Sequence, residues 1–117
     1  MDNKHKAGIA GQEAAEKFLQ SKGYEVLARN YRIKTGEIDL VLKDGMYIVF
    51  VEVKFRTSTK YGLPREAVGY TKQQRIINTA LHYLTHHKLT ENDIRFDVVE
   101  VLMERGKLYA SHIENAF

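Results

Sequence analysis

The sequence contains no cysteine, a single proline, and no apolar run near the roughly 20 residues that a membrane-spanning helix needs. Without cysteine the chain can form neither a disulfide bond nor a thiolate metal site. The polar N-terminal residues are not followed by the apolar stretch of a signal peptide. We therefore expect a cytoplasmic protein with no membrane among its partners.

The composition is typical of an ordinary globular domain. The 117 residues are 44% hydrophobic and 28% charged, and they contain no repeat, low-complexity segment or linker. A single domain over residues 1–117 is therefore expected, with one core. The net charge of +3 is mildly basic, which is a weak indication of anionic partners.

Residues 36–54 predict two strands and a tight turn, because Asp44-Gly45 stands between two apolar runs. With Asp44 and Gly45 as the loop, Val41 pairs with Ile48. Side chains alternate between the two faces of a strand. One face of this hairpin is then an almost unbroken apolar surface of Ile38, Leu40, Leu42, Tyr47, Val49, Val51 and Val53.

The other face combines apolar residues near the turn with charges at its far end, which are Glu37, Asp39, Glu52 and Lys54. The predicted register makes Asp39 and Glu52 diagonal neighbours, about 7 Å apart between backbone positions. Burying two carboxylates together is costly, and a Mg²⁺ ion between them would remove that cost. The alternative, favoured for an arbitrary hairpin, is a salt-bridged strand end in which Lys54 neutralises Glu52.

Residues 7–22 predict a helix that ends at Gly23. Its inward stripe consists of Gly11, Gln12, Ala15, Phe18, Leu19 and the stem of Lys22. Gln12 lies at the edge of this stripe, whereas Glu13 points away from it. From the helix alone, Gln12 is better explained as a helix-flank residue than as a functional one.

Basic residues lie in the sequence both before and after the hairpin. Arg29 and Arg32 lie in a predicted strand over residues 24–32, and solvent exposure explains them better than phosphate binding. The segment 55–63 predicts a polar loop whose Arg56 and Lys60 suit a sugar-phosphate backbone. Polar loops of this kind are also generic, so this signal is weak by itself.

Residues 71–87 predict a second helix, which a capping box of Thr71 and Gln74 would start. Its apolar stripe is Ile76, Ile77, Ala80, Tyr83 and Leu84. Gln73 lies at the centre of that stripe and needs a partner. Either it lies beside the Asp39 and Glu52 pair, or it bonds a nearby backbone group. Lys72 and Arg75 flank it and could contact phosphate.

His82 and His86 have helical i, i+4 spacing, but they lack the glutamate of the zinc-protease helix motif, so zinc binding is a minor alternative. Residues 94–102 and 108–113 predict two further strands. Asp97 is a further acid of the chain, and pairing with Arg95 explains it best. The expected order α-β-β-β-α-β-β is that of an α/β sandwich with helices covering a mixed sheet.

The resemblance to a known family depends on five stretches that span nearly the whole chain. With Asp on the second strand and Glu-x-Lys on the third, the chain resembles the PD-(D/E)xK nuclease superfamily. It resembles the YraN-type uncharacterised bacterial family more closely, which is related to archaeal Holliday junction resolvases. The matching stretches are Gly36-Glu37-Ile38-Asp39-Leu40, Phe50-Val51-Glu52-Val53-Lys54, Thr71-Lys72-Gln73-Gln74-Arg75-Ile76, Arg95-Phe96-Asp97-Val98-Val99 and Asn115-Ala116-Phe117.

The resemblance implies a restriction-endonuclease-like α-β-β-β-α-β core with an extra C-terminal strand. It also implies that Asp39, Glu52 and the backbone carbonyl of Val53 bind Mg²⁺ or Mn²⁺. Lys54 would orient or help deprotonate the attacking water, or stabilise the charged phosphorane. Gln73 matches the glutamine or lysine that such folds place on the following helix.

The sequence departs from this family at Gln12, where the family usually carries a glutamate of the metal site. The amide still offers a neutral oxygen, but a metal should bind it more weakly. The expected function is a nuclease that hydrolyses DNA, branched DNA included, or RNA, with a homodimer suited to two-fold symmetric junctions. The alternative is a non-catalytic nucleic-acid-binding module that retains the nuclease fold.

Overall fold

The structure is a computed structural model, and it describes residues 3–57 and 68–117. Two helices and five strands follow one another in the predicted order. They are α1 (Asn3–Ser21), β1 (Glu25–Ile33), β2 (Gly36–Asp44), β3 (Tyr47–Arg56), α2 (Tyr70–His86), β4 (Asp93–Glu104) and β5 (Lys107–Ile113). None of the described helices is long and apolar enough to cross a membrane.

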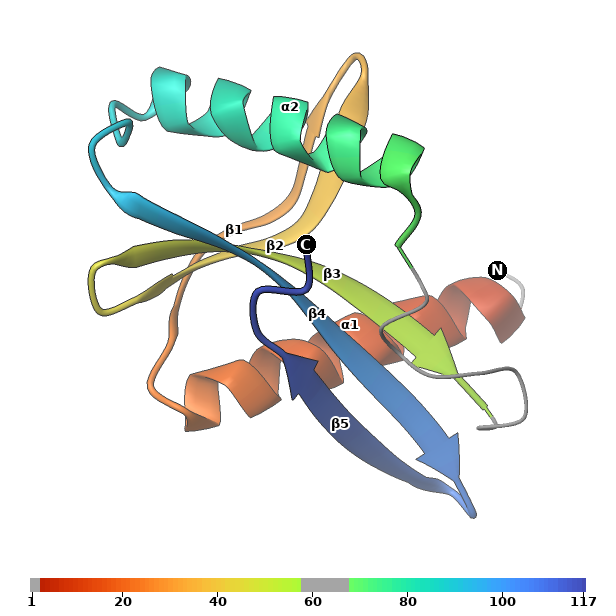
Figure 1. Ribbon diagram of the computed structural model, residues 1–117. Helices are drawn as coiled ribbons and strands as arrows, with labels where there is room; N and C mark the ends of the chain where they lie inside the picture. Colours follow the sequence, from red (N-terminus) through yellow and green to blue (C-terminus); the bar gives the residue numbers. More distant parts are fainter. Residues whose placement is uncertain (1–2, 58–67) are drawn as a thin grey trace.

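The strands form one mixed sheet in the order β1-β2-β3-β4-β5. Its neighbours are antiparallel except for β3 and β4, which are parallel because the chain crosses over through α2 between them. Figure 1 shows α1 on one face of the sheet and α2 on the other. The predicted mixed α/β fold, with its additional C-terminal strand, is confirmed.

Each helix covers its own apolar cluster. Under α1, Ala15 and Leu19 pack against buried sheet residues, which are Leu40, Leu42, Val49, Val51, Val99 and Val101. Under α2, Ile76, Ala80 and Tyr83 pack against Ile38, Val41, Ile48 and Phe50. Because both faces of β2 and β3 are covered, these strands are apolar on both sides near the turn.

The predicted register of the β2–β3 hairpin is wrong by two residues. Asp44 pairs with Tyr47 and Val41 with Phe50, so the loop consists of Gly45 and Met46. Gly45 has φ +58°, and a two-residue turn of the II′ type has glycine with positive φ at its first loop position. A slip of two residues leaves every side chain on its predicted face, so the alternation alone could not reveal it.

The end of β2 follows a path that the alternation did not predict. Its ladder with β3 ends at the pair Leu40 and Val51, whereas its ladder with β1 continues to Ile33 and Gly36. Figure 1 shows this end of the β1–β2 hairpin rising beside α2. Ile38 therefore packs under α2, and the prediction that it shares a face with Leu40 is wrong.

The helix boundaries are close to those expected, but the predicted cap of α2 is wrong. Its N-cap residue is Gly69, no side chain caps it, and the Gly69 carbonyl accepts a 2.9 Å hydrogen bond from the backbone N–H of Gln73. Since the helix begins before Thr71, that residue is not at the cap position that a capping box requires. The stop of α1 at Gly23 is confirmed by its φ of +92°.

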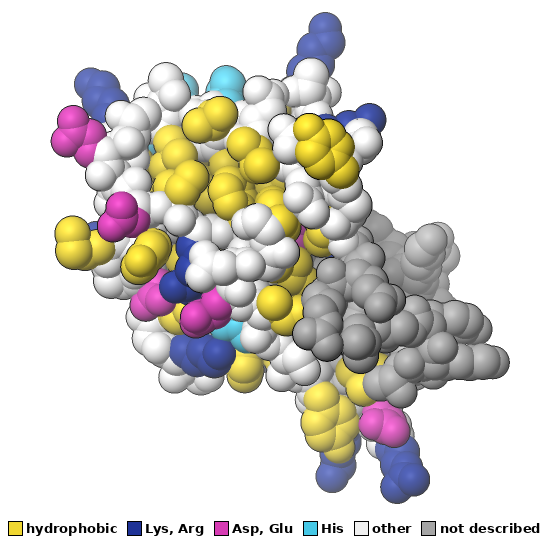
Figure 2. All heavy atoms as spheres, viewed as in Figure 1, with side chains coloured by type: hydrophobic (Ala, Val, Ile, Leu, Met, Phe, Trp, Pro, Cys, Tyr) yellow, Lys and Arg dark blue, Asp and Glu magenta, His cyan; other side chains and the backbone are white. Residues whose placement is uncertain are grey.

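The C-terminal residues close one edge of the α2 face. Phe117 stacks on Phe96 with ring centroids 5.2 Å apart, and Phe96 stacks on Phe50 at 5.5 Å. Figure 2 shows hydrophobic side chains gathered on the upper half of this view, where α2 lies. The terminus thus adds apolar cover beside α2.

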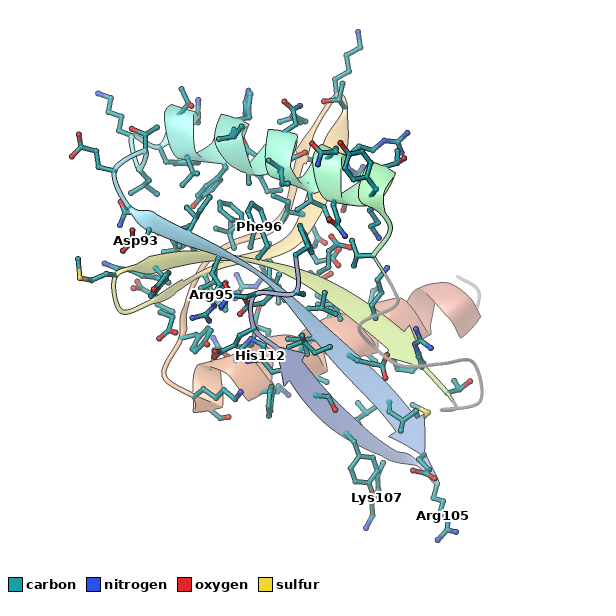
Figure 3. The ribbon with its side chains drawn as sticks, in the orientation of Figure 1. Asp93, Arg95, Phe96, Arg105, Lys107 and His112 are labelled. Atoms are coloured by element: carbon teal, nitrogen blue, oxygen red, sulfur yellow. The ribbon has the colours of Figure 1, made fainter. Side chains whose placement is uncertain are left out.

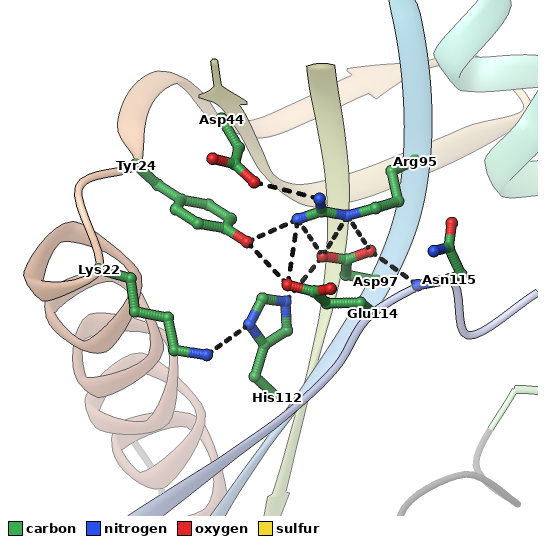
Figure 4. A network of polar contacts seen from close by, with 8 residues as sticks. All are labelled: Lys22, Tyr24, Asp44, Arg95, Asp97, His112, Glu114 and Asn115. Atoms are coloured by element: carbon green, nitrogen blue, oxygen red, sulfur yellow. Dashed lines mark hydrogen bonds and ion pairs between the residues drawn. The ribbon is translucent and has the colours of Figure 1, made fainter. Parts of the chain in front are cut away.

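A buried polar network lies at the α1 side of the sheet. Arg95 and His112 converge there, whereas Phe96 points toward α2 (Figure 3). The Arg95 guanidinium donates to both carboxylate oxygens of Asp97, and His112 Nε2 lies 2.7 Å from Asp97 Oδ2 (Figure 4). The expectation that Asp97 pairs with Arg95 is confirmed.

Candidate active site

The candidate site forms where β2 separates from β3. The β2–β3 register, continued one pair beyond the end of the ladder, brings Asp39 opposite Glu52, whereas the predicted register made them diagonal neighbours. Because the two backbones part there, the carboxylate of Asp39 replaces the missing strand partner. Its Oδ2 accepts a 2.8 Å hydrogen bond from the backbone N–H of Val53.

Burial disfavours the charge on both carboxylates. Glu52 is buried, and Asp39 is half-buried. Desolvation raises the pKa of Glu52, and the nearby charge of Asp39 raises it further. Desolvation also raises the pKa of Asp39, against the hydrogen bond from Val53. Two crowded acids whose ionisation is unfavourable are typical of a site that binds a cation.

Lys54 lies beside these acids, as the strand alternation predicts. It is half-buried, and both carboxylates act electrostatically on its ammonium. Burial lowers the pKa of Lys54, and a hydrogen bond with Lys72 lowers it further. Asp39, Glu52 and Lys54 therefore lie near enough to act electrostatically on one another.

Lys72 joins this cluster from α2, which sequence reasoning missed. Its Nζ lies 2.9 Å from Glu52 Oε2. Burial opposes its charge, but the hydrogen bond and the charge of Glu52 raise the pKa of Lys72 above its ordinary value. The sequence analysis expected Lys72 to contact phosphate. Its position in the first turn of α2, next to Gln73, could have indicated that it reaches the acidic cluster.

The two glutamines occupy different surroundings. Gln12 Nε2 lies 3.4 Å from the backbone carbonyl oxygen of Asp39, at the long end of hydrogen-bond distances, so Gln12 does reach the site. Gln73 instead donates from Nε2 to the Val68 carbonyl at 3.0 Å. This is the local backbone bond that the sequence left open, and a catalytic role for Gln73 stays a prediction.

The predicted phosphate-binding cations that the structure describes differ in their surroundings. Arg56 lies largely buried with its Nε 2.9 Å from Glu100 Oε2, as an ion pair without an aligned hydrogen bond at that oxygen. Arg75 is exposed on α2. Lys60 lies outside the described residues. The solvated interpretation of Arg29 is supported, because it is exposed and pairs with Glu16.

A groove of about 920 Å³ opens beside the acids, between α1 and the β1–β2 hairpin. Asp39, Val53 and Gln12, three of the predicted metal ligands, lie on its wall. The remaining lining residues are Gly8, Ile9, Glu13, Glu16, Arg29, Asn30, Arg32, Glu37 and Phe55. Asn30 has φ +50°, a backbone conformation that side-chain-bearing residues adopt rarely and that sequence reasoning missed.

The donor atoms at this site fit a hard divalent cation. Carboxylate, carbonyl and amide oxygens are the ligands that Mg²⁺ and Mn²⁺ prefer. The Lys72 ammonium beside Glu52 shows that the acids attract positive charge. Across residues 3–57 and 68–117, this site included, no group of three or more His, Cys, Asp or Glu side chains is arranged to hold a metal, so the site offers two carboxylates together with carbonyl and amide oxygens. His82 contacts the Tyr31 hydroxyl instead, at 2.6 Å.

Residues 11–101 match the uncharacterised protein family UPF0102. This chain belongs to that family. A UPF0102 protein of Lachnoclostridium phytofermentans is 47% identical over 116 residues, which cover 98% of this chain and 95% of the relative. A UPF0102 protein of Clostridioides difficile is 44% identical over 117 residues, with 100% of both chains covered. The YraN-type family named from the sequence motifs is thereby confirmed.

The segment that matches UPF0102 contains all the residues of the acidic cluster and both glutamines. It ends within β4, so the β4–β5 turn and the tail that carries Phe117 lie beyond it. Because the relatives are named by family alone, the function of this UPF0102 protein is argued from the site and not from the fold.

Proposed function

We propose that this UPF0102 protein is a metal-dependent nuclease that hydrolyses phosphodiester bonds in nucleic acid, with branched DNA as the first substrate class to test and RNA as the second. The observation that carries the proposal is the proximity of Asp39, Glu52 and Lys54 at the point where β2 and β3 part, with Asp39 on the wall of a groove. The resemblance to the PD-(D/E)xK superfamily supports the same assignment.

The chain supplies the ligands and the orienting groups. Asp39, Glu52, the Val53 carbonyl and the Gln12 amide oxygen would hold Mg²⁺ or Mn²⁺. When bound, such an ion polarises a phosphoryl oxygen and makes a coordinated water more acidic. The partly buried Lys54 amine is placed to orient the attacking water or to stabilise charge that develops on the phosphate.

Nucleic-acid contacts are proposed for the cations that flank the site. Arg75 is exposed on the same helix as Lys72, three residues further on, so both can contact one backbone segment. Phosphate contacts by Arg56 and Lys60 stay part of the proposal; Arg56 carries an ion pair with Glu100, and Lys60 lies outside the described residues. A two-fold homodimer that engages the two halves of a junction completes the proposal.

A second candidate function is a nucleic-acid-binding module without catalysis. The presence of Gln12 and of Lys72 favours it, because each makes the acidic cluster less negative than two or three bare carboxylates would be. Such a module would bind DNA with strong salt dependence and would leave it intact.

A cleavage assay separates the two candidates. The purified protein is incubated with a four-way DNA junction, duplex DNA, single-stranded DNA and single-stranded RNA, with Mg²⁺, Mn²⁺ or EDTA. We expect metal-dependent cleavage that Asp39→Asn and Glu52→Gln abolish, and that Lys54→Met lowers by about 100-fold or more. The matched control is Glu104→Gln at the exposed β4–β5 turn.

The outcomes are distinct. Cleavage that persists in Asp39→Asn would come from another enzyme and would contradict the assignment. Salt-sensitive binding of any of the four substrates, without cleavage in either metal, would establish the non-catalytic module. The dimer is tested separately by analytical ultracentrifugation with and without the junction.

A further inference from the structure

The Lys72 side chain brings a positive charge from α2 into the acidic cluster. The Lys72 side chain is 48% exposed, whereas that of its partner Glu52 is 6% exposed. About half of the Lys72 side chain is therefore accessible to solvent, while its ammonium lies against a buried carboxylate. A lysine in this arrangement can leave by rotating its four-carbon stem, without a change in the sheet.

The charges of the cluster balance without any metal ion. Asp39 and Glu52 carry two negative charges when ionised, and Lys54 and Lys72 carry two positive charges when protonated. The positive charge of Lys72 lowers the pKa of Lys54, so the two side-chain nitrogens lie close together. An approaching divalent cation has to compete with the Lys72 ammonium for Glu52.

Of the two lysines, Lys72 is the one that can be displaced. Lys54 extends from a central strand of the sheet and is half-buried. Lys72 lies in the exposed first turn of α2, with Arg75 one turn further along. A phosphate that approaches this turn gains two cations as partners, and charge-assisted bonds to phosphate are strong.

We propose that Lys72 is an internal counter-ion that competes with the metal for Glu52, and that a nucleic-acid phosphate draws it away. This inference rests on the proposed function, because it assigns a regulatory role to the same site. Metal and nucleic acid then bind cooperatively. By thermodynamic linkage, each raises the affinity of the protein for the other by the same factor.

The test is calorimetric titration of Mn²⁺ into the full chain, alone and with a single-stranded DNA oligonucleotide that a gel shows to be intact at the end. The variants are Lys72→Met, which removes the charge, and Lys72→Arg, which keeps it. The control is Lys107→Met, which makes the same change in net charge at the tip of the β4–β5 turn (Figure 3). Thermal melts establish that all variants fold.

Without DNA, we expect Lys72→Met to bind Mn²⁺ about 10-fold more tightly than the wild type, Lys72→Arg and Lys107→Met do. DNA should raise the Mn²⁺ affinity of the wild type and should have little effect on that of Lys72→Met. Equal or weaker Mn²⁺ binding by Lys72→Met, in a protein that still cleaves nucleic acid, overturns the inference and leaves the nuclease in place. Absence of Mn²⁺ binding in every protein, with and without DNA, overturns both.

Discussion

The backbone N–H of Val53 donates a 2.8 Å hydrogen bond to the carboxylate of Asp39, at the position where the β2–β3 ladder has already ended. A side chain thus completes the hydrogen bonding of a strand whose neighbour has turned away. This arrangement fixes one acid of the candidate site, and it also places the Val53 peptide beside that acid. The site and the separation of the strands are therefore one structural feature.

Replacing Asp39 should separate its structural role from its charge. Asp39→Asn keeps an oxygen acceptor for the Val53 N–H, whereas Asp39→Ala leaves that partly buried donor without its partner. Both variants lack the charge, so the difference between them reports the hydrogen bond. We expect Asp39→Ala to be less stable than Asp39→Asn by about 1–3 kcal/mol in urea unfolding with EDTA present. Equal stability would show that water replaces the acceptor.

The sequence was sufficient to predict that Asp39, Glu52 and Lys54 lie near one another, because a hairpin brings the ends of its two strands together. It was not sufficient to set the register. The dipeptide Asp44-Gly45 favoured one turn, the structure forms the turn at the next residue, and both registers bury the same side chains. Only the conformation of the turn distinguishes the two registers, and the pattern of buried residues does not indicate that conformation.

Lys72 shows a second limit of sequence reasoning. The sequence predicted that Lys72 flanks Gln73 and could contact phosphate, and about half of its side chain is exposed. Which group the Lys72 ammonium contacts depends on how α2 packs over the end of β3, and helical periodicity does not determine that packing. The same is true of Gln73, for which the stripe allowed two partners and the backbone of Val68 is the one present.

The raised pKa of Glu52 predicts a pH-dependent cost of folding. In the folded state this carboxyl holds its proton to higher pH than its ordinary value of 4.5, so its contribution to stability is present below that pH and is lost as pH rises through the folded pKa. Glu52→Gln cannot titrate. In EDTA, its stability relative to the wild type should therefore increase between about pH 4 and pH 7, as measured by urea unfolding across that range.

Glu104→Gln at the exposed turn controls for the loss of one acidic group from the whole chain. Its stability relative to the wild type should change less across the same pH range. A difference between Glu52→Gln and the wild type that is constant with pH, or that shrinks toward neutral pH, would contradict the assigned burial of this carboxylate.

Asp97 should be among the most sensitive positions of the buried polar network. It is 0% exposed, and it accepts hydrogen bonds from Arg95 and from the backbone N–H of Asn115. Asp97→Ala leaves the Arg95 guanidinium buried without its main partner, so we expect a loss of about 3–5 kcal/mol in urea unfolding at pH 7. Arg95→Met should cost less, because Asp97 keeps His112 and Asn115.

The lowered pKa of Asp97 predicts that the protein loses stability as pH falls, whereas the raised pKa of Glu52 predicts a loss as pH rises. Burial acts to raise the pKa of Asp97, but the hydrogen bonds from His112 and Arg95 outweigh it and hold that pKa below its ordinary value of 3.8. Its stabilising contribution is present above pH 3.8 and is lost as pH falls through the folded pKa. If Asp97→Asn unfolds at the same acidic pH as the wild type, this carboxylate does not govern acid unfolding.

Gly36 of the β1–β2 hairpin packs against α2 with no room for a side chain. A Cβ atom on Gly36 would lie 2.2 Å from Thr79 Oγ1 and 3.1 Å from the Arg75 carbonyl. Gly36→Ala should destabilise the protein by about 1–3 kcal/mol through overpacking. Adding Thr79→Ala should recover part of that loss, since the carbonyl stays. Gly8→Ala, with nothing within 4 Å, is the control and should stabilise α1. Additive effects of the two substitutions would exclude the contact.

Replacing Gln12 with glutamate should strengthen metal binding and lower the stability of the metal-free protein. The Gln12 amide lies 3.4 Å from the Asp39 backbone carbonyl, so a carboxylate placed there adds a third negative charge near two acids that burial already disfavours. We expect Gln12→Glu to bind Mn²⁺ about 10-fold more tightly in calorimetry, and to melt at a lower temperature than the wild type in EDTA at pH 7.

Gln20→Glu, the same change at an exposed position of α1, should neither bind Mn²⁺ more tightly nor melt at a lower temperature. If Gln12→Glu leaves both the Mn²⁺ affinity and the melting temperature unchanged, the first helix does not contribute to the site, and the groove wall beside Asp39 has no part in binding the metal.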